Sequence, residues 1–300
     1  MELRQLKYFL KLSERLNFSE ASKELNITQS TLSQQIKLLE SEFGTNLFVR
    51  DSHSVALTEA GEELIPFARK TVKSSDECRE RMLDLQNVLV GTLNIGVTYS
   101  FSPILTETLF SFMRKYRGVK LNIFYKPMEE LMAMLRQRQI DFLLAFKPSE
   151  PLIGVESHTL FQNYLAAIIS ENHPLAKSKR ITLEELSRHS LALPSKGLQA
   201  RNALERILER HHYTLKINME LNDPTILMDI IRQSLLVTVL AEASVHRESG
   251  IKAIPIDAPG NEMEGCVHTL SNTYHKKSMK EFVKLLRESL AVKERANAWL

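Results

Sequence analysis

Residues 18–36 read FSEASKELNITQSTLSQQI, and this stretch is the most informative part of the chain. Ser19 is a good N-cap for a short helix over residues 20–25, and Asn26 can end that helix in a left-handed conformation. Thr28 is a second N-cap, and it opens a longer helix that stops at Gly44. Two helices joined by such a tight turn are typical of a helix-turn-helix motif.

The neighbouring segments extend this motif to a winged helix. A first amphipathic helix is predicted by apolar residues at helical spacing, namely Leu3, Leu6, Phe9, Leu10 and Leu12. Beyond Gly44, two short β-prone runs at residues 47–49 and 55–57 enclose a polar stretch, as the strands of a wing do. Residues 1–58 are therefore predicted to form a winged helix-turn-helix domain.

A long helix is predicted next, over residues 59–90, with Thr58 as its N-cap. Apolar and small residues recur along it at alternating spacings of four and three, which is a heptad seam. We expect this linker helix to pair with a second copy of the chain, in a homodimer or homotetramer, through Leu64, Met82, Leu85 and Leu89. Several seam positions are small or polar, so the alternative is a helix that packs only within its own subunit.

Residues 91–300 change to strands that alternate with helices, which predicts an α/β domain with a parallel sheet covered by helices. Strands are expected at 92–97, 119–125 and 142–146 in a first lobe, and at 165–170, 191–193, 216–221, 235–240 and 251–256 in a second. A strand at 267–271 and a closing amphipathic helix should return to the first lobe. We therefore expect lobe I at residues 91–163 and 266–300, and lobe II at 164–265.

Composition excludes several classes of protein. Hydrophobic residues make up 43% of the 300 residues and the net charge is only +3, so the chain is neither disordered nor uniformly basic. No apolar run is long enough for a membrane span, and Cys78 and Cys266 match no metal or disulfide spacing, so we expect a cytoplasmic protein without a metal or other cofactor. Nucleophile, zinc and phosphate-loop motifs are missing from the sequence, which disfavours an enzyme.

Three N-terminal motifs resemble the signature of LysR-type transcriptional regulators: residues 27–36, Gly44-Thr45-Asn46-Leu47-Phe48-Val49-Arg50 and Leu57-Thr58-Glu59-Ala60-Gly61. Two later runs, Asp141-Phe142-Leu143-Leu144-Ala145 and Asn172-His173-Pro174-Leu175-Ala176, are similar to the effector domain of that family, so the likeness covers the whole chain. Within the family, Ala145-Phe146-Lys147-Pro148 looks most like the cyanate-responsive branch. The resemblance implies a two-lobed domain like type 2 periplasmic binding proteins, with a small effector between its lobes. It also implies double-stranded operator DNA and RNA polymerase as partners.

The second helix of the motif carries the candidate DNA-binding residues. Its polar side can read base edges in the major groove or grip phosphates, through Thr28, Gln29, Ser30, Thr31, Ser33, Gln34, Lys37 and, from the wing, Arg50. Basic and acidic side chains balance within residues 1–58, so the amides and hydroxyls rather than net charge point to DNA. The wing has Ser52-His53-Ser54 where many relatives carry basic residues, which leaves Arg50 nearly alone there. The alternative is an ordinary solvated helix face.

The effector is expected beyond the carboxyl ends of the strands, where ligands of open α/β sheets bind. The candidates are Thr98, Tyr99, Ser100, Phe101, Met128, Phe146 and Lys147 in the first lobe, and Ser195, Lys196, Asp223 and Thr225 in the second. Hydroxyls at helix starts together with a lysine suit a small anion. The alternative is that the hydroxyls are helix caps and the lysines face solvent.

We interpret the chain as a DNA-binding regulator controlled by a small effector. A solute-binding protein for transport would explain two lobes but would need an export signal, which the charged N-terminus does not resemble. An α/β enzyme would need a catalytic set, which the motifs do not supply.

Overall fold

The computed structural model describes residues 1–51, 54–86, 89–245 and 248–297. The chain forms two compact units, Met1–Asn87 and Val88–Leu300, and each has its own hydrophobic core. Within the described residues, no helix combines the length and apolar character that crossing a membrane requires.

Three helices build the first unit: α1 (Leu3–Arg15), α2 (Phe18–Glu24) and α3 (Gln29–Phe43). They pack around fully buried apolar side chains, among them Phe9, Leu32, Ile36 and Leu39. The turn between α2 and α3 follows the prediction, since Asn26 has φ 54° and the Thr28 hydroxyl accepts the N–H of Thr31 at 3.1 Å. Gly44 ends α3 with φ 66°.

The N-cap of α2 was predicted wrongly. Asn17, not Ser19, caps this helix, because its Oδ1 accepts the N–H of Glu20 at 3.1 Å. The helix therefore begins at Phe18, whose ring packs against the core of the unit. Asparagine is among the strongest N-capping residues, and here it also lets the apolar neighbour enter the helix.

The wing and linker helix complete this unit. Strands β1 (Phe48–Arg50) and β2 (Val55–Leu57) pair antiparallel as predicted, and α4 (Glu59–Leu85) begins at the predicted cap Thr58. A Cβ at Gly61 would lie 2.2 Å from the carbonyl oxygen of Leu47, so only glycine allows the helix to start this close to the wing. The helix ends at Leu85, with Gln86 as C-cap, rather than near residue 90.

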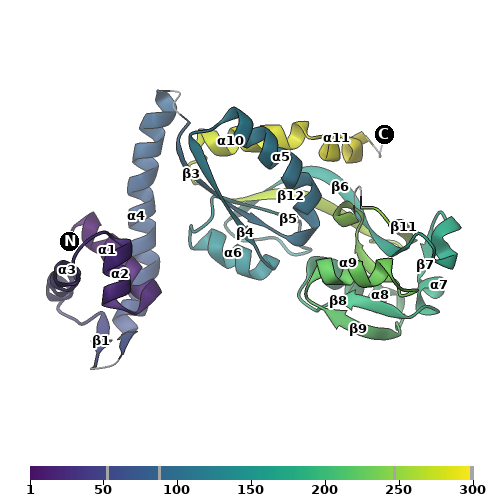
Figure 1. Cartoon of the computed structure of the whole chain (residues 1–300), viewed down its shortest axis with the longest axis horizontal. Coiled ribbons are helices and arrows are strands. Elements are labelled where there is room, and N and C mark those ends of the chain that lie inside the picture. The colour runs from purple at the N-terminus through teal and green to yellow at the C-terminus, as the bar shows by residue number, and fades with distance from the viewer. Residues whose placement is uncertain (52–53, 87–88, 246–247, 298–300) are drawn as a thin grey trace. The chain divides into compact units, whose positions relative to one another are not determined.

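Lobe I of the second unit is a sheet covered on both faces. Parallel strands β3 (Gly91–Val97), β4 (Val119–Tyr125) and β5 (Phe142–Phe146) lie in the order β4-β3-β5. Helices α5 (Ser102–Lys115) and α10 (Lys277–Glu288) lie on one side of the sheet and α6 (Met128–Arg136) on the other (Figure 1). The closing helix thus returns to this lobe, as predicted.

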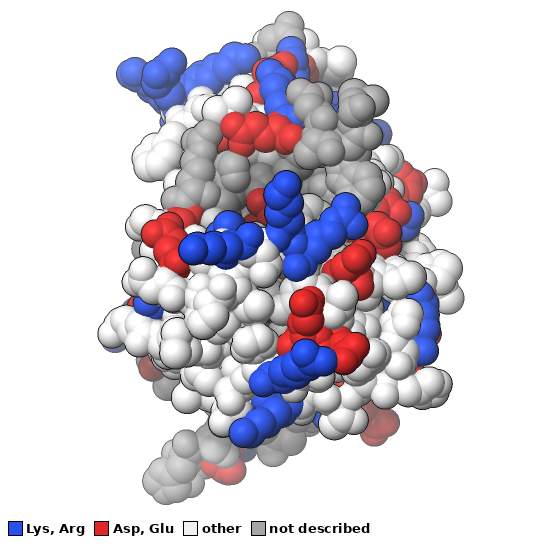
Figure 2. Space-filling model, turned by 90° about the vertical axis from the view of Figure 1, so that its right-hand side faces the viewer, with Lys and Arg blue, Asp and Glu red and all other residues white. Residues whose placement is uncertain are grey.

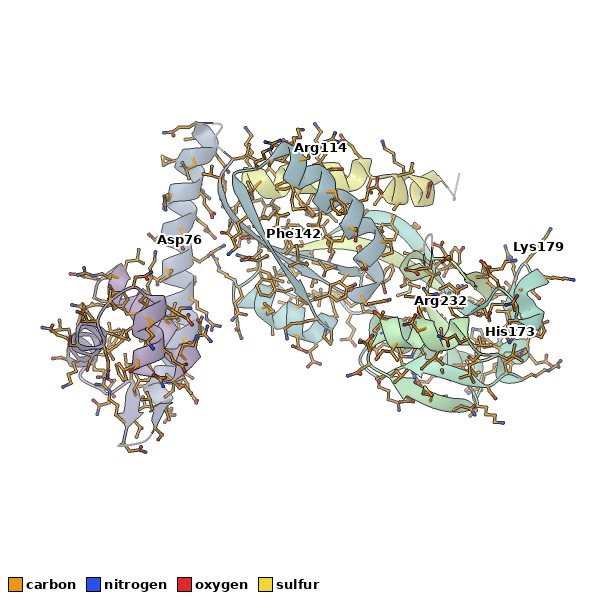
Figure 3. All side chains as sticks on the ribbon, in the orientation of Figure 1. Asp76, Arg114, Phe142, His173, Lys179 and Arg232 are labelled. Atoms are coloured by element: carbon orange, nitrogen blue, oxygen red, sulfur yellow. The ribbon has the colours of Figure 1, made fainter. Side chains whose placement is uncertain are left out.

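The period-two pattern of β5 explains these layers. Phe142, Leu144 and Phe146 belong to the core on the side of α5 and α10, while Leu143 and Ala145 belong to the core under α6. The ring of Phe142 lies 5.7 Å from that of Phe282 on α10, between sheet and helices (Figure 3). A strand apolar on both faces is what a covered parallel sheet requires.

The sheet is mixed rather than parallel throughout. Strand β12 (Glu262–Leu270) runs antiparallel between β5 and the long strand β6 (Val155–Ser170). We predicted that this long strand begins at residue 165, but it begins ten residues earlier (155 against 165). Its first part is mostly exposed and polar, so it lacks an apolar pattern and becomes a strand by pairing with β12.

Strand β6 also joins the lobes. Beyond Tyr164 it pairs with β10 (Thr238–Ala241) and β11 (Ile251–Asp257) in lobe II. The remaining elements are β7 (Ile181–Thr182), α7 (Leu183–Ser187), β8 (Leu191–Pro194), α8 (Gln199–His211), β9 (Ile217–Leu221), α9 (Pro224–Arg232) and α11 (Leu290–Asn297). The chain returns to lobe I between the end of β11 at Asp257 and the start of β12 at Glu262. The lobe boundary that we predicted between residues 265 and 266 therefore lies a few residues too late, inside β12.

Candidate functional site

Helix α3 presents the predicted DNA-binding side chains to solvent. Gln29, Ser30, Thr31, Gln34 and Lys37 are exposed, and Ser33 is half-buried. The opposite side of the helix is anchored by fully buried Leu32, Ile36 and Leu39. The polar face is therefore carried on a rigid support, as a helix that enters the major groove must be.

The start of α3 holds a cluster of hydroxyl groups. Thr28 Oγ1 lies 2.9 Å from Ser30 Oγ and 2.8 Å from Thr31 Oγ1. Ser19 of α2 donates to Gln29 Oε1 at 3.3 Å, so the amide oxygen of Gln29 is already engaged. The side chain of Gln34 is exposed and makes no hydrogen bond to the described residues, which leaves its whole carboxamide available to a ligand.

Arg50, which we predicted to contact DNA nearly alone on the wing, forms an ion pair within its own unit. Its Nη2 lies 2.6 Å from Glu40 Oε2, and its guanidinium lies 5.0 Å from the centre of the Phe18 ring. The other oxygen of Glu40 accepts the N–H groups of Leu47 and Phe48 at 3.0 and 3.2 Å. Arg50 is therefore compensated inside its own unit and helps to hold the wing. The wing residues Ser52 and His53 lie outside the described residues.

The four predicted seam residues do not form one stripe. Leu64 packs against the core of its own unit, and Leu89 lies beyond α4 and packs against the core of the second unit. Met82 and Leu85 remain on the helix surface, with exposed fractions of 57% and 76%. Phe67, which we did not include, is 65% exposed on the same helix.

A small cavity lies between the lobes of the second unit, with a volume of about 160 Å³. Four of its lining residues were predicted, namely Thr98, Tyr99, Ser100 and Met128. Lobe I adds Tyr125, Lys126 and Pro127, and lobe II contributes Pro194, Leu198, Gln199, Ala200, Asn222, Pro224 and Leu240. Apart from Pro194 of β8 and Leu240 of β10, these residues lie at or next to the starts of α5, α6, α8 and α9, so four helix N-termini border the cavity.

Two tyrosines form one wall of this interlobe cavity. The Tyr125 hydroxyl donates to the carbonyl of Tyr99 at 3.0 Å, and the two rings meet edge to face at 6.1 Å. The Tyr99 hydroxyl reaches across to lobe II, 4.0 Å from Met228 Sδ. Burial, with a smaller effect of Tyr125, raises the pKa of Tyr99 to about 12. Its phenol is therefore a neutral hydrogen-bond donor at physiological pH.

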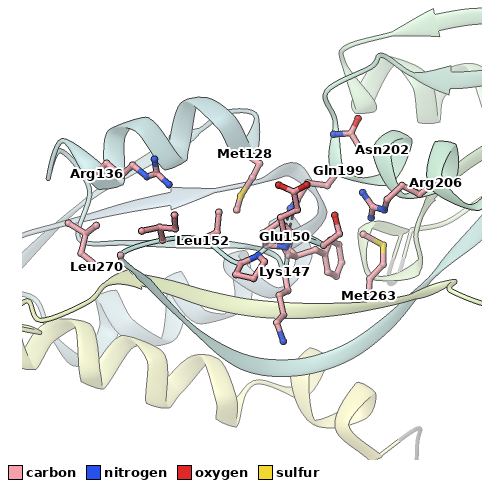
Figure 4. Close-up of a pocket in the computed structure, with 16 residues that line it drawn as sticks. Met128, Arg136, Lys147, Glu150, Leu152, Gln199, Asn202, Arg206, Met263 and Leu270 are labelled. Atoms are coloured by element: carbon pink, nitrogen blue, oxygen red, sulfur yellow. Dashed lines mark hydrogen bonds between the residues drawn. The ribbon is translucent and has the colours of Figure 1, made fainter.

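The predicted aromatic and lysine contacts in lobe I lie elsewhere. Phe101 has no exposed surface, and its ring packs at 5.4 Å from both Phe146 and Phe161 in the core. The Phe146 ring shares that core. Lys147 Nζ lies 3.4 Å from Glu264 Oε1 on β12, and Figure 4 shows its side chain directed away from α8. None of these three side chains lines the interlobe cavity in the described part of the chain.

The predicted lobe II residues surround this cavity without lining it. Asp223 is the N-cap of α9, since its Oδ1 accepts the N–H groups of Thr225 and Ile226 at 2.8 and 3.2 Å. Thr225 is exposed next to the Tyr99 hydroxyl, with which it interacts. Ser195 is half-buried and Lys196 is exposed. The cap of α9 is therefore the carboxylate of Asp223 and not the hydroxyl of Thr225.

A second, larger cavity lies next to the interlobe cavity and shares Met128 and Gln199 with it. This groove has a volume of about 820 Å³ and is lined by the chain from Phe146 to Gly154, by α6 and by α8. Figure 4 shows Arg136 of α6 on one side of it and Asn202 and Arg206 of α8 on the other. No sequence pattern predicts this groove, because its basic residues lie on helix faces far apart in the chain.

Charge elsewhere on the second unit is mixed. Figure 2 shows basic and acidic side chains interspersed over the outer face of lobe II. Within this lobe, Arg188 pairs with Glu184 at 2.6 Å and Arg180 with Asp257 at 3.4 Å. Among the residues that the structure describes, no group of three or more His, Cys, Asp or Glu side chains could hold a metal ion. The interlobe cavity and the groove could each admit a small ligand, and two further cavities of about 480 and 420 Å³ lie elsewhere on this unit.

Two family descriptions match the chain. Residues 3–62 match the bacterial regulatory helix-turn-helix proteins of the lysR family, and residues 86–291 match the LysR substrate binding domain. The chain belongs to the LysR family of transcriptional regulators. The predicted family and fold are confirmed, and the chain combines a DNA-binding domain with an effector-binding domain.

Individual relatives are similar to this chain, in sequence or in structure, over most of its length. The Escherichia coli K12 regulator YnfL, itself uncharacterized, is 31% identical over 80% of this chain and 82% of its own. A full-length OxyR variant from Pseudomonas aeruginosa has a TM-score of 0.74 at 23% identity, covering 98% of this chain and 95% of its own. CbnR, solved with its target DNA, has a TM-score of 0.67 at 20% identity and covers 96% and 99%. The two structures share the fold of this chain.

Proposed function

We propose that this LysR-family regulator reads its operator through the exposed face of α3, with Gln34 as the principal base-reading residue. The supporting observation is that the Gln34 carboxamide is exposed and unengaged by the described residues, on a helix whose other face is fully buried. A glutamine in the major groove can bond to N6 and N7 of adenine at once. Gln29 reads a second base with the amide group that Ser19 does not occupy.

The remaining side chains of this face position the protein on the phosphates. Lys37 supplies a charge, and the hydroxyls of Thr28, Ser30, Thr31 and Ser33 add neutral contacts at the start of the helix. Arg50 contributes indirectly, because its pairing with Glu40 holds the wing. Such contacts fix the position of the domain without selecting a sequence.

The test compares Gln34→Ala with Lys37→Ala on DNA recovered by binding-site selection and on random DNA. Gln34→Ala should lose about 1–3 kcal/mol at one base position and little on random DNA, whereas Lys37→Ala should weaken binding to both alike. Fluorescence anisotropy at several salt concentrations measures both effects, because a lost phosphate contact also lowers the salt slope by about one. Equal losses of Gln34→Ala on both DNAs would refute the assignment.

We further propose that a small anionic effector binds in the interlobe cavity. The cavity of about 160 Å³ is below the ~300–1,000 Å³ of ordinary ligand pockets, so it suits a ligand of few heavy atoms. Lys147 pairs with Glu264, and Lys126 pairs with Glu130 at 2.5 Å, so neither lysine supplies an uncompensated charge. The attraction for an anion comes instead from the helix N-termini other than that of α9, whose first N–H groups Asp223 occupies, and from the hydroxyl of Ser100. The Thr98 hydroxyl donates to the carbonyl of Leu144 at 3.3 Å.

Thermal unfolding of the full-length protein tests this site with small anions beside neutral and cationic analogues. The matching anion should stabilise the effector domain by about 2.7 kcal/mol at a hundredfold excess over Kd. Ser100→Ala should remove that gain, while Ser187→Ala, on α7 outside the cavity, should keep it. Stabilisation by neutral aromatic compounds alone would overturn the proposal of an anion.

The effector would act by shifting a population of quaternary arrangements, which it can do only through different affinities for them. We propose a homodimer or homotetramer in the cytoplasm, assembled through α4, in which the effector changes the spacing of two winged helices on operator DNA. RNA polymerase is the proposed downstream partner. Tandem recognition of two half-sites would make DNA affinity depend strongly on dimerisation.

A further inference from the structure

The edge of strand β5 is left open where β3 turns away. The two strands pair over Ile95–Val97, and the last ladder bond runs from the N–H of Thr98 to the carbonyl of Leu144. The chain then leaves the sheet in the short helical turn Tyr99–Phe101. On this side of β5, the N–H and C=O of the buried residue Phe146 therefore have no strand partner. Buried backbone groups without partners are costly, so something else must satisfy them.

Gln199 of lobe II satisfies both groups. Its Nε2 donates to the carbonyl oxygen of Phe146 at 2.7 Å, and its Oε1 accepts the N–H of Phe146 at 3.1 Å. The carboxamide thus acts as one more peptide unit added to the sheet of lobe I. Because Gln199 is the first residue of α8, these two bonds tie the lobes together.

The same side chain stands between the two cavities. Met128 of lobe I and Gln199 of lobe II line both the interlobe cavity of about 160 Å³ and the groove of about 820 Å³. Figure 4 shows Gln199 at the end of the groove where α8 begins, with Arg206 farther along the same helix. Residues 199 and 206 are seven positions apart, which is about 10 Å along a helix axis. A ligand held in the interlobe cavity meets Gln199 before it could reach Arg206.

We propose that Gln199 is the residue that limits the size of the effector. Its side chain, placed by the bonds to Phe146, fills the opening between the interlobe cavity and the groove, so that short anions fit and longer anions with a second charged group are excluded. Without this side chain the cavities join, and Arg206 becomes a second anchor. The size limit rests on the proposed function, in which the effector binds between the lobes, whereas the closure itself does not.

The first experiment tests the closure without any ligand. Hydrogen exchange of the full-length protein, followed by mass spectrometry, reports on the N–H of Phe146. Gln199→Ala and Gln199→Met should both speed exchange of this amide at least tenfold, because neither side chain offers an acceptor. Unchanged exchange in both variants would overturn the closure, whatever the effector is.

The second experiment tests the size limit with linear dicarboxylates from malonate to suberate, measured by thermal shift of the full-length protein. Only the shortest members should stabilise the wild type and Gln199→Met, which keeps the bulk of the side chain. Gln199→Ala should bind the longer members at least tenfold more tightly than the wild type, and adding Arg206→Ala should remove that gain. Stabilisation of the wild type by suberate would overturn the size limit. If exchange rises but no dicarboxylate stabilises any variant, the closure stands, while the size limit and the proposed anionic effector fail.

Discussion

Replacing Glu40 by alanine should destabilise the DNA-binding unit more than any other change to a charged side chain of α3. Glu40 is only 8% exposed, yet it bonds to Arg50 and to the N–H groups of Leu47 and Phe48. Leu47 and Phe48 are themselves buried, so their N–H groups would lose their acceptor without gaining water. Each such bond to a charged group contributes about 1.5–3 kcal/mol.

We expect Glu40→Ala to lower the free energy of unfolding of this unit by about 3–5 kcal/mol, since the three bonds share one carboxylate and do not add fully. At about 4–8 °C per kcal/mol for a domain of this size, the melting temperature should fall by roughly 12 °C or more. Glu40→Gln should cost less, because its amide oxygen still accepts the N–H groups. Guanidinium unfolding of the full-length protein, monitored by hydrogen exchange, measures the stability of each unit separately.

Glu42→Ala is the matched control. Glu42 lies on the same helix, is exposed and pairs with the N-terminal amine, so its loss should cost no more than about 0.5 kcal/mol. Arg50→Ala should resemble a weaker form of Glu40→Ala and leave the salt slope of DNA binding unchanged. A loss below about 1 kcal/mol for Glu40→Ala would refute the argument that this carboxylate organises the wing. If Arg50→Ala reduces the salt slope of DNA binding by about one, Arg50 contacts a DNA phosphate instead.

Three further predictions concern assembly, pH and backbone packing. Charges at Met82 and Leu85, as Met82→Glu with Leu85→Glu, should dissociate the oligomer and weaken DNA binding, and light scattering that still reports a dimer would show that α4 packs only within its subunit. His268 is buried, bonded to a serine hydroxyl and a main-chain carbonyl, and burial lowers its pKa from 6.5 to about 4. The neutral ring therefore stabilises the fold above pH 6.5, and the free energy of unfolding should fall by about 3 kcal/mol as pH drops from 6.5 to 4. Urea unfolding at a series of pH values measures this dependence, and His268→Gln should weaken it. Gly61→Ala should cost about 1–3 kcal/mol by thermal unfolding, because its Cβ would meet the carbonyl of Leu47; a neutral effect would mean that α4 can shift.

The local elements of this protein could be predicted from its sequence alone. Helix α3 begins after Thr28 and ends at Gly44, and α4 begins after Thr58, as the capping chemistry of these residues predicts. A cap can be predicted locally because it satisfies backbone groups only one turn away. The apolar run 142–146 is a buried strand, and the order of elements after residue 91 predicts the α/β domain. The polar face of α3 could also be predicted, since the buried Leu32, Ile36 and Leu39 fix which side of the helix faces solvent.

The partner of each polar side chain, by contrast, depends on tertiary contacts. Arg50 forms an ion pair with Glu40, and Lys147 forms one with Glu264, because those carboxylates lie close in space. The sequence pattern alone shows only two basic side chains that are expected to be exposed. The first half of β6 is a strand because β12 pairs with it, and Gln199 completes β5 from the other lobe. Hydrogen bonds between distant segments depend on where the whole chain places a donor and an acceptor, and no local periodicity encodes that distance.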